Sequence, residues 1–178
     1  MEAVTEFARA QVVGNPLDEA TTCGPMASEA HLNRLLGFID RARETQARLT
    51  IGGQRPADLD RGWFVQPTVF ADVDNHDPIA VEEVFGPVLT VIPYDGGDDA
   101  AIRMANDSAY GLAGSVWTAD EARGVEVARH VRTGTIGVNY YAIDPRAPFG
   151  GMKDSGIGRE RGPEGLAGCD GAAAAPGR

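Results

Sequence analysis

Glu83 and Phe85 are two side chains whose types and spacing suit a defined chemistry. They lie in the run EEVFGP at 82–87, and in an extended segment residues at that spacing point to the same face. A carboxylate accepts both hydroxyl protons of a ribose diol as charge-assisted hydrogen bonds, and an aromatic ring packs against a flat ring such as nicotinamide. The alternative interpretation is a solvated helix end at Glu82 and Glu83, with Phe85 in the core.

Other residues with reactive or metal-binding side chains form no such pattern. Cys23 and Cys169 lie at opposite ends of the chain, no CxxC pair occurs and the three histidines are scattered, so a zinc site has little support. Neither a histidine nor a cation neighbours Cys23 in sequence, and we interpret both thiols as structural. The run GIGRERG at 156–162 resembles a dinucleotide fingerprint, but Arg161 stands where the third glycine belongs.

Hydrophobic patterning predicts an α/β fold around a parallel sheet. From Ser28, a suitable helix N-cap, apolar residues recur to Ala42 with the spacing of an amphipathic helix. Short extended segments follow at 49–51, 63–65 and 68–70, and Pro67 places the latter two at a sheet edge or in a break.

Further along the chain, strands and helices alternate as in βαβ units. The predicted strands are 88–92, 112–117 and 135–138, and the predicted helices are 98–106 and 120–131. The strand at 88–92 is apolar and β-branched, which is typical of a strand buried on both faces.

Composition limits the possible functions. The chain has 178 residues, of which 43% are apolar, enough for one sizeable core. Its formal net charge is −10, and residues 62–102 contain no Lys or Arg, which disfavours binding to nucleic acid or to a membrane surface. The N-terminus lacks the pattern of a signal peptide, and no apolar stretch approaches the roughly 20 residues that span a bilayer. Together with the two lone thiols, these features predict a cytoplasmic protein.

Four blocks, taken in order, resemble the C-terminal part of an aldehyde dehydrogenase of the NAD(P)-dependent superfamily. They are EEVFGPV at 82–88, ANDSAYGL at 105–112, GTIGVN at 134–139 and PFGGMKDSG at 148–156. The resemblance covers about residues 7–166. It implies that residues 1–166 form a truncated, parallel-sheet catalytic subdomain of that family's fold, including the cofactor-facing segment, and that residues 167–178 are a low-complexity tail.

The resemblance also implies roles for particular side chains. Glu83 matches the glutamate that binds the nicotinamide-side ribose, and Phe85 matches the phenylalanine that contacts the nicotinamide, so the implied cofactor is NAD or NADP. The segment 139–151 matches the loop that lines the aldehyde entrance. The candidate substrate-binding residues on this loop are Tyr140, Tyr141 and Phe149. An aromatic lining suits apolar aldehydes, although loop aromatics also serve to anchor a loop to the core.

By resemblance, the chain is part of an enzyme that oxidises an aldehyde to a carboxylic acid. The family's nucleophilic cysteine, general-base glutamate and oxyanion-hole asparagine precede the part matched here, and Cys23 falls in a Thr-x-x-Gly-Pro turn instead. We therefore assign no catalytic residue, and we expect the isolated chain to be inactive and to associate with the missing N-terminal half or a full-length homologue. The alternative is a non-catalytic short homologue that docks onto a full-length subunit. A nucleotide-binding module acting alone is a third possibility, which the missing fingerprint weakens.

Overall fold

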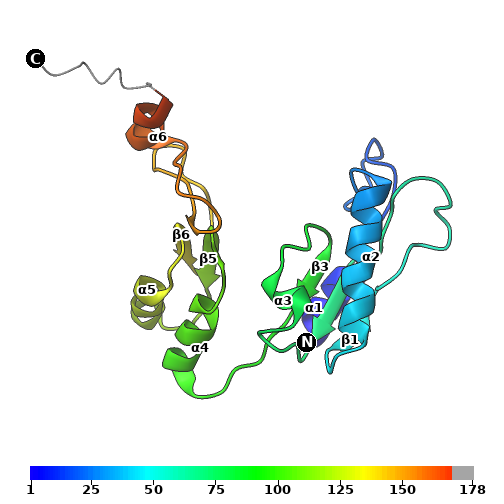
Figure 1. Ribbon diagram of the computed structural model, residues 1–178, viewed down its shortest axis with the longest axis horizontal. Coiled ribbons are helices and arrows are strands. Elements are labelled where there is room, and N and C mark those ends of the chain that lie inside the picture. The colour runs from blue at the N-terminus through cyan, green and yellow to red at the C-terminus, as the bar shows by residue number, and fades with distance from the viewer. Residues whose placement is uncertain (170–178) are drawn as a thin grey trace, which may run out of the picture. The chain divides into compact units, whose positions relative to one another are not determined.

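The computed structural model describes residues 1–169, which divide into two compact units (Figure 1). Unit 1 comprises Met1–Pro93, and unit 2 begins at Tyr94. Each unit has its own helices and its own strand pairing. Within residues 1–169 no helix is long and apolar enough to cross a membrane.

Unit 1 is built on a three-stranded mixed sheet. Its elements are α1 (Glu2–Arg9), α2 (Glu29–Arg43), β1 (Arg48–Ile51), β2 (Thr68–Ala71), α3 (Pro78–Val81) and β3 (Val88–Thr90). The middle strand, β2, pairs antiparallel with β1 and parallel with β3. All four β2 residues are buried. Pro67 directly precedes β2, so the predicted break in the extended chain is present there. The strand that follows, β2, is the central strand of the sheet and does not lie at its edge.

Helix α2 supplies much of the core of unit 1. The Ser28 side chain accepts a hydrogen bond from the His31 backbone N–H at 3.2 Å, which confirms the predicted N-cap. The apolar stripe of α2 packs in one cluster with Phe70 from β2. The buried members of that stripe are Leu32, Leu35, Ile39 and Ala42. Because they recur every three or four residues, one face of the helix is removed from water.

Unit 2 contains two short two-stranded sheets. Its elements are α4 (Gly97–Asn106), β4 (Tyr110–Gly111), β5 (Ala113–Val116), α5 (Glu121–His130), β6 (Thr135–Val138), β7 (Met152–Lys153) and α6 (Gly162–Cys169). Strands β5 and β6 pair in parallel, with α5 between them in the chain, and β4 pairs antiparallel with β7. Helix α6 includes the first three residues of the predicted tail, and the remainder, 170–178, lies outside the described residues.

The predicted parallel sheet of three strands is wrong in its pairing. The strand predicted at 88–92 is β3, which ends at Thr90 and pairs with β2 rather than with β5. The βαβ units are therefore β2–α3–β3 and β5–α5–β6. Helix α3 has only four residues, too few to show an amphipathic period, and for that reason the patterning did not reveal the first unit. Leu89 of β3 is 49% exposed, so this strand is not buried on both faces.

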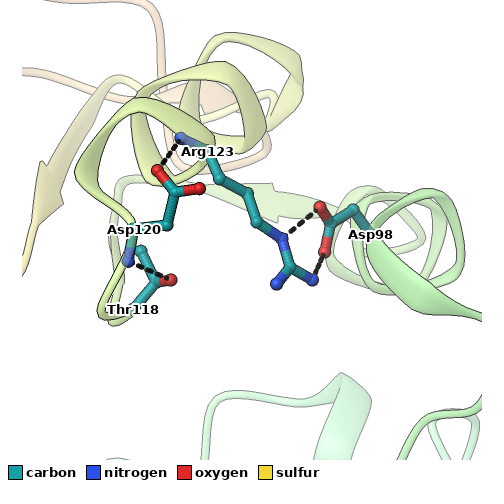
Figure 2. A network of polar contacts seen from close by, with 4 residues as sticks. All are labelled: Asp98, Thr118, Asp120 and Arg123. Atoms are coloured by element: carbon teal, nitrogen blue, oxygen red, sulfur yellow. Dashed lines mark hydrogen bonds and ion pairs between the residues drawn. The ribbon is translucent and has the colours of Figure 1, made fainter.

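Helices α4 and α5 are linked by a bidentate ion pair, shown in Figure 2. The Nε and Nη2 atoms of Arg123 donate to the two carboxylate oxygens of Asp98 at 2.7 and 2.6 Å. These hydrogen bonds lower the pKa of Asp98. The Asp120 carboxylate accepts from the Arg123 backbone N–H at 3.1 Å, and Thr118 Oγ1 accepts from the Asp120 N–H at 3.2 Å. Arg123 therefore takes part both in the N-terminal cap of α5 and in the ion pair that links α5 to α4.

Asp98→Asn is expected to lower the stability of unit 2 slightly at about pH 7 and by less at about pH 2. The pKa of Asp98 is lowered by folding, so its ionised form stabilises the fold above the ordinary value of about 3.9, and this contribution is lost as the pH falls through the lowered value. The effect is small because the pair is exposed to solvent. Thermal unfolding of both proteins at the two pH values in low salt measures it, with Asp99→Asn as the control. A difference that is as large in acid as at neutral pH would contradict this explanation.

Candidate functional site

The segment 82–87 links α3 to β3 and carries both predicted cofactor residues. Phe85 has a backbone φ of 57°, in the left-handed region, so the alternation of an extended strand does not apply there. The extended geometry from which Glu83 and Phe85 were predicted to share a face is therefore absent at Phe85. A bulky residue in that region costs on the order of 1–3 kcal/mol and persists only where its surroundings hold it.

Helix α2 holds the backbone of this segment. Arg34 Nη2 donates to the Glu83 carbonyl at 2.7 Å, and Arg34 Nη1 donates to the Val84 carbonyl at 3.1 Å. His31 Nε2 lies 2.5 Å from the Phe85 carbonyl, and since a carbonyl only accepts, Nε2 carries the proton. Three consecutive carbonyls are therefore bound by two side chains that are neighbours on one helix face.

The side chains of Glu83 and Phe85 remain open to solvent. Phe85 is 72% exposed, and its ring centroid lies 5.9 Å from that of His31. Glu83 is also exposed, and its carboxylate makes no hydrogen bond or ion pair with another of residues 1–169. Gly86 packs against α2, since a Cβ at this position would overlap Leu35 Cδ1. The alternative with Phe85 in the core is wrong, because the ring is on the surface.

The predicted substrate residues lie on the loop that follows β6. Asn139 starts the loop at a φ of 55°, and its side-chain oxygen accepts from the Thr118 N–H at 2.8 Å. Tyr141 is anchored, because its hydroxyl lies 3.0 Å from Thr135 Oγ1. Phe149 is half-buried and exchanges two backbone hydrogen bonds with Glu160, both 2.7 Å long. These two residues fit the anchoring alternative.

Tyr140 differs from the other two loop aromatics. It is 71% exposed, and within residues 1–169 its side chain makes no hydrogen bond and stacks on no other ring. Its ring is available for contact with another molecule. The predicted cofactor residues belong to unit 1 and the predicted substrate residues to unit 2.

Cys23 has the environment of a structural thiol. Its backbone N–H donates to the Val12 carbonyl at 3.0 Å, and its Sγ lies 3.9 Å from the Gly24 carbonyl. Burial raises the pKa of the Cys23 thiol, which disfavours the nucleophilic thiolate. The side chain of Cys169 lies outside the described residues. Among residues 1–169 no group of three His, Cys, Asp or Glu side chains could hold a metal ion.

His31 and Arg34 were not among the predicted site residues. Arg34 is noticeable in the sequence only as a charge off the apolar stripe of α2, and His31 only as one of three scattered histidines. Their contacts with the 82–87 segment span 49 to 54 residues of sequence. Their spacing of three on a helix was the one available signal, and it indicates a shared face without indicating what that face binds.

Comparison with protein families identifies the chain. The model of the aldehyde dehydrogenase family matches residues 1–169. The chain belongs to the aldehyde dehydrogenase family. The resemblance seen in the four sequence blocks is thereby confirmed.

Two curated aldehyde dehydrogenases illustrate the similarity. Geranial dehydrogenase of Castellaniella defragrans is 52% identical over 166 residues, which cover 93% of this chain and 34% of the relative. Betaine aldehyde dehydrogenase of Brucella ovis is 44% identical over 170 residues, covering 94% of this chain and 35% of the relative.

Solved aldehyde dehydrogenase structures match the fold as well. The Mycobacterium tuberculosis enzyme in complex with NAD⁺ has a TM-score of 0.89 and 57% identity, covering 93% of this chain and 34% of that one. Betaine aldehyde dehydrogenase of Staphylococcus aureus, also in complex with NAD⁺, has a TM-score of 0.89 and 39% identity, covering 94% and 34%. The chain spans about a third of the length of the relatives it matches.

Proposed function

We propose that this chain supplies the nicotinamide-side cofactor contacts and part of the substrate channel of an NAD(P)-dependent aldehyde dehydrogenase. The reaction is oxidation of an aldehyde to a carboxylic acid. NAD⁺ or NADP⁺, when bound, supplies the hydride acceptor. The chain contributes binding and orientation to this reaction, and no residue of the chain is assigned a covalent or proton-transfer role.

The observation that carries the proposal is the presentation of Glu83 and Phe85. The Glu83 carboxylate is exposed and makes no contact within residues 1–169 that would compete with a ligand, so its oxygens are free to accept the two hydroxyl protons of a ribose. The exposed Phe85 ring, two residues away, provides an apolar face for the nicotinamide. The backbone that carries both is held by hydrogen bonds from α2. These residues fit the cofactor that the family uses.

The substrate side of the proposal rests on the loop after β6. Tyr140 contacts the aldehyde with its exposed ring, while the anchored Tyr141 and Phe149 shape the loop that carries it. An aromatic surface favours an apolar aldehyde. We also propose that the protein is cytoplasmic. The free thiol of Cys23 supports this location, because the cytoplasm is reducing.

A chimaera tests the proposal. This chain replaces the matching third of the Castellaniella geranial dehydrogenase, to which it is 52% identical. The chimaera is expected to oxidise geranial with NAD⁺ or NADP⁺, whereas the 178-residue chain alone shows no turnover above background. The parent enzyme lacking that third is the control. A chimaera that melts like its parent but has no activity would contradict the proposal, as would turnover by the isolated chain that disappears in Cys23→Ser.

A second candidate is a non-catalytic role, in which the chain docks onto a full-length aldehyde dehydrogenase. Large apolar side chains that are mostly exposed in each unit favour it. They include Phe7 and Leu17 in unit 1 and Trp117 and Ile157 in unit 2. Docking onto another chain would remove these side chains from water, which favours association. Co-elution of the chain with an intact homologue, in the absence of activity in the chimaera, would favour docking over the enzymatic role.

A further inference from the structure

We propose that Lys153 and Asn106 are positioning residues that fix the end of the substrate loop, residues 139–151, where the chain enters β7. The inference rests on the proposed function, because it deepens the role proposed for that loop. Neither residue touches the aldehyde in this proposal. Both act through the backbone that carries Tyr140 and Phe149.

The loop needs this support because the strand that follows it is short. Strand β7 has two residues, and its pairing with β4 places Lys153 opposite Tyr110. Lys153 has a backbone φ of 56°, in the left-handed region that is unfavourable for a residue with a side chain of this length. Such a conformation persists only where its surroundings hold it, so contacts beyond the strand pairing must contribute.

The Lys153 side chain reaches the end of α4. Its Nζ donates to the carbonyls of Asn106 and Ser108, both at 2.9 Å. Asn106 is the last residue of α4, where the helix carbonyls lack an intrahelical partner and carry a partial negative charge, so an ammonium group is well placed there. The Lys153 residue is half-buried. Its two hydrogen bonds tie β7 to α4 across 45 to 47 residues of sequence.

Asn106 extends this contact to the second helix of the unit. Its side-chain oxygen accepts from the Arg132 backbone N–H at 2.6 Å, and its amide nitrogen donates to the His130 carbonyl at 2.8 Å. His130 is the last residue of α5. The residue that binds Lys153 therefore also joins the C-terminal ends of α4 and α5. The opposite end of the loop is held separately, by the Asn139 side chain on the Thr118 N–H.

The first measurement labels amines of the whole chain with an N-hydroxysuccinimide ester. Lys153 is the only lysine, so acylation of its Nζ reports its contacts directly. Acylation is expected to be at least about tenfold slower in the native chain than in the chain unfolded by urea, because hydrogen bonds to a charged group must first break. The α-amino group of Met1 is the internal reference. Equal relative rates in the two states would overturn the proposal.

The second measurement uses the chimaera. Lys153→Met keeps a long side chain and removes the donors. It is expected to raise the KM for geranial roughly five- to tenfold, as follows if the loop holds its binding conformation only about a tenth to a fifth of the time. The KM for NAD⁺ should stay unchanged. Asn106→Ala should act in the same direction, and Lys153→Arg should restore most of the affinity, because a guanidinium also donates to carbonyls.

Ala128→Gly is the structural control. Ala128 lies in α5 and is 9% exposed, and glycine within a helix lowers stability. The substitution changes no hydrogen bond of Lys153 or Asn106, since an alanine side chain makes none. It should lower the melting temperature and leave both KM values unchanged. An unchanged KM for geranial in Lys153→Met, or an equal rise in Ala128→Gly, would overturn the positioning role.

Failure of the proposed function gives a different result. If Tyr140→Ala leaves the KM for geranial unchanged in the chimaera, the substrate role of the loop fails, while the labelling of Lys153 still decides whether its Nζ is held. If Tyr140→Ala raises that KM and neither Lys153→Met nor Asn106→Ala does, the substrate role stands and the positioning role fails.

Discussion

Phe70→Ala is expected to lower the free energy of unfolding of unit 1 by about 3–5 kcal/mol, the usual cost of removing a fully buried aromatic ring. Phe70 is 0% exposed and lies in β2, the strand that pairs with both of its neighbours. Its ring packs in the same cluster as the apolar stripe of α2. The substitution removes apolar contacts from both layers and leaves a cavity between them.

Phe7→Ala is the matched control, since it makes the same chemical change at a position in unit 1 that is 72% exposed. Denaturant unfolding followed by tryptophan fluorescence measures the difference. Trp63 belongs to unit 1 and Trp117 to unit 2, so a Trp117→Phe background isolates the signal of unit 1. A loss below about 1 kcal/mol for Phe70→Ala would show that the contact between β2 and α2 does not form the core of this unit.

Helices α2, α4 and α5 could be predicted because their signals are local. Ser28 and Asp120 each accept a hydrogen bond from the backbone N–H three residues later, and these caps stand directly before the apolar periods that continue the helices. Cap and period both lie within a few residues of each other. Predicted and observed helix ends therefore agree closely for α2 and α5, and they also agree closely for α4, which has no side-chain cap.

Strand pairing could not be read in the same way. The segments that form β2, β3 and β5 were all predicted as extended or as strands, and their sequences do not state which two are neighbours. Helix α3, which joins β2 to β3, has only four residues and shows no period. Alternation of longer elements therefore favoured pairing β3 with β5, whereas β3 pairs in parallel with β2 from Thr68 opposite Val88.

The candidate site was predictable in its residues and not in its geometry. The EEVFGP run singled out Glu83 and Phe85, yet Phe85 has a left-handed backbone, and the carbonyls of this segment accept hydrogen bonds from Arg34 and His31 about fifty residues earlier. No local pattern encodes such contacts. The loop shows the same limit, because only the structure distinguishes the anchored Tyr141 from the exposed Tyr140.

Glu83→Ala in the chimaera is expected to raise the KM for NAD⁺ at least about tenfold. The carboxylate is proposed to accept both ribose hydroxyls, and a hydrogen bond to a charged group contributes about 1.5–3 kcal/mol, where roughly 1.4 kcal/mol corresponds to a factor of ten. Glu83→Gln keeps the shape and exchanges charged for neutral hydrogen bonds. It should therefore lie between the wild type and Glu83→Ala, with a several-fold increase. The KM for the aldehyde should stay nearly constant in both variants.

Comparison of Glu83→Ala with Glu82→Ala tests the central claim most directly. Both glutamates are exposed and adjacent, and neither side chain makes a hydrogen bond or ion pair within residues 1–169, so the two substitutions remove the same charge from the same surface. The measurement is the KM for NAD⁺ of the chimaera, together with its KM for geranial. We predict a tenfold or larger increase for NAD⁺ with Glu83→Ala and little change with Glu82→Ala. Equal effects of the two substitutions, or a larger effect of Glu82→Ala, would contradict the assignment of Glu83 to the cofactor ribose.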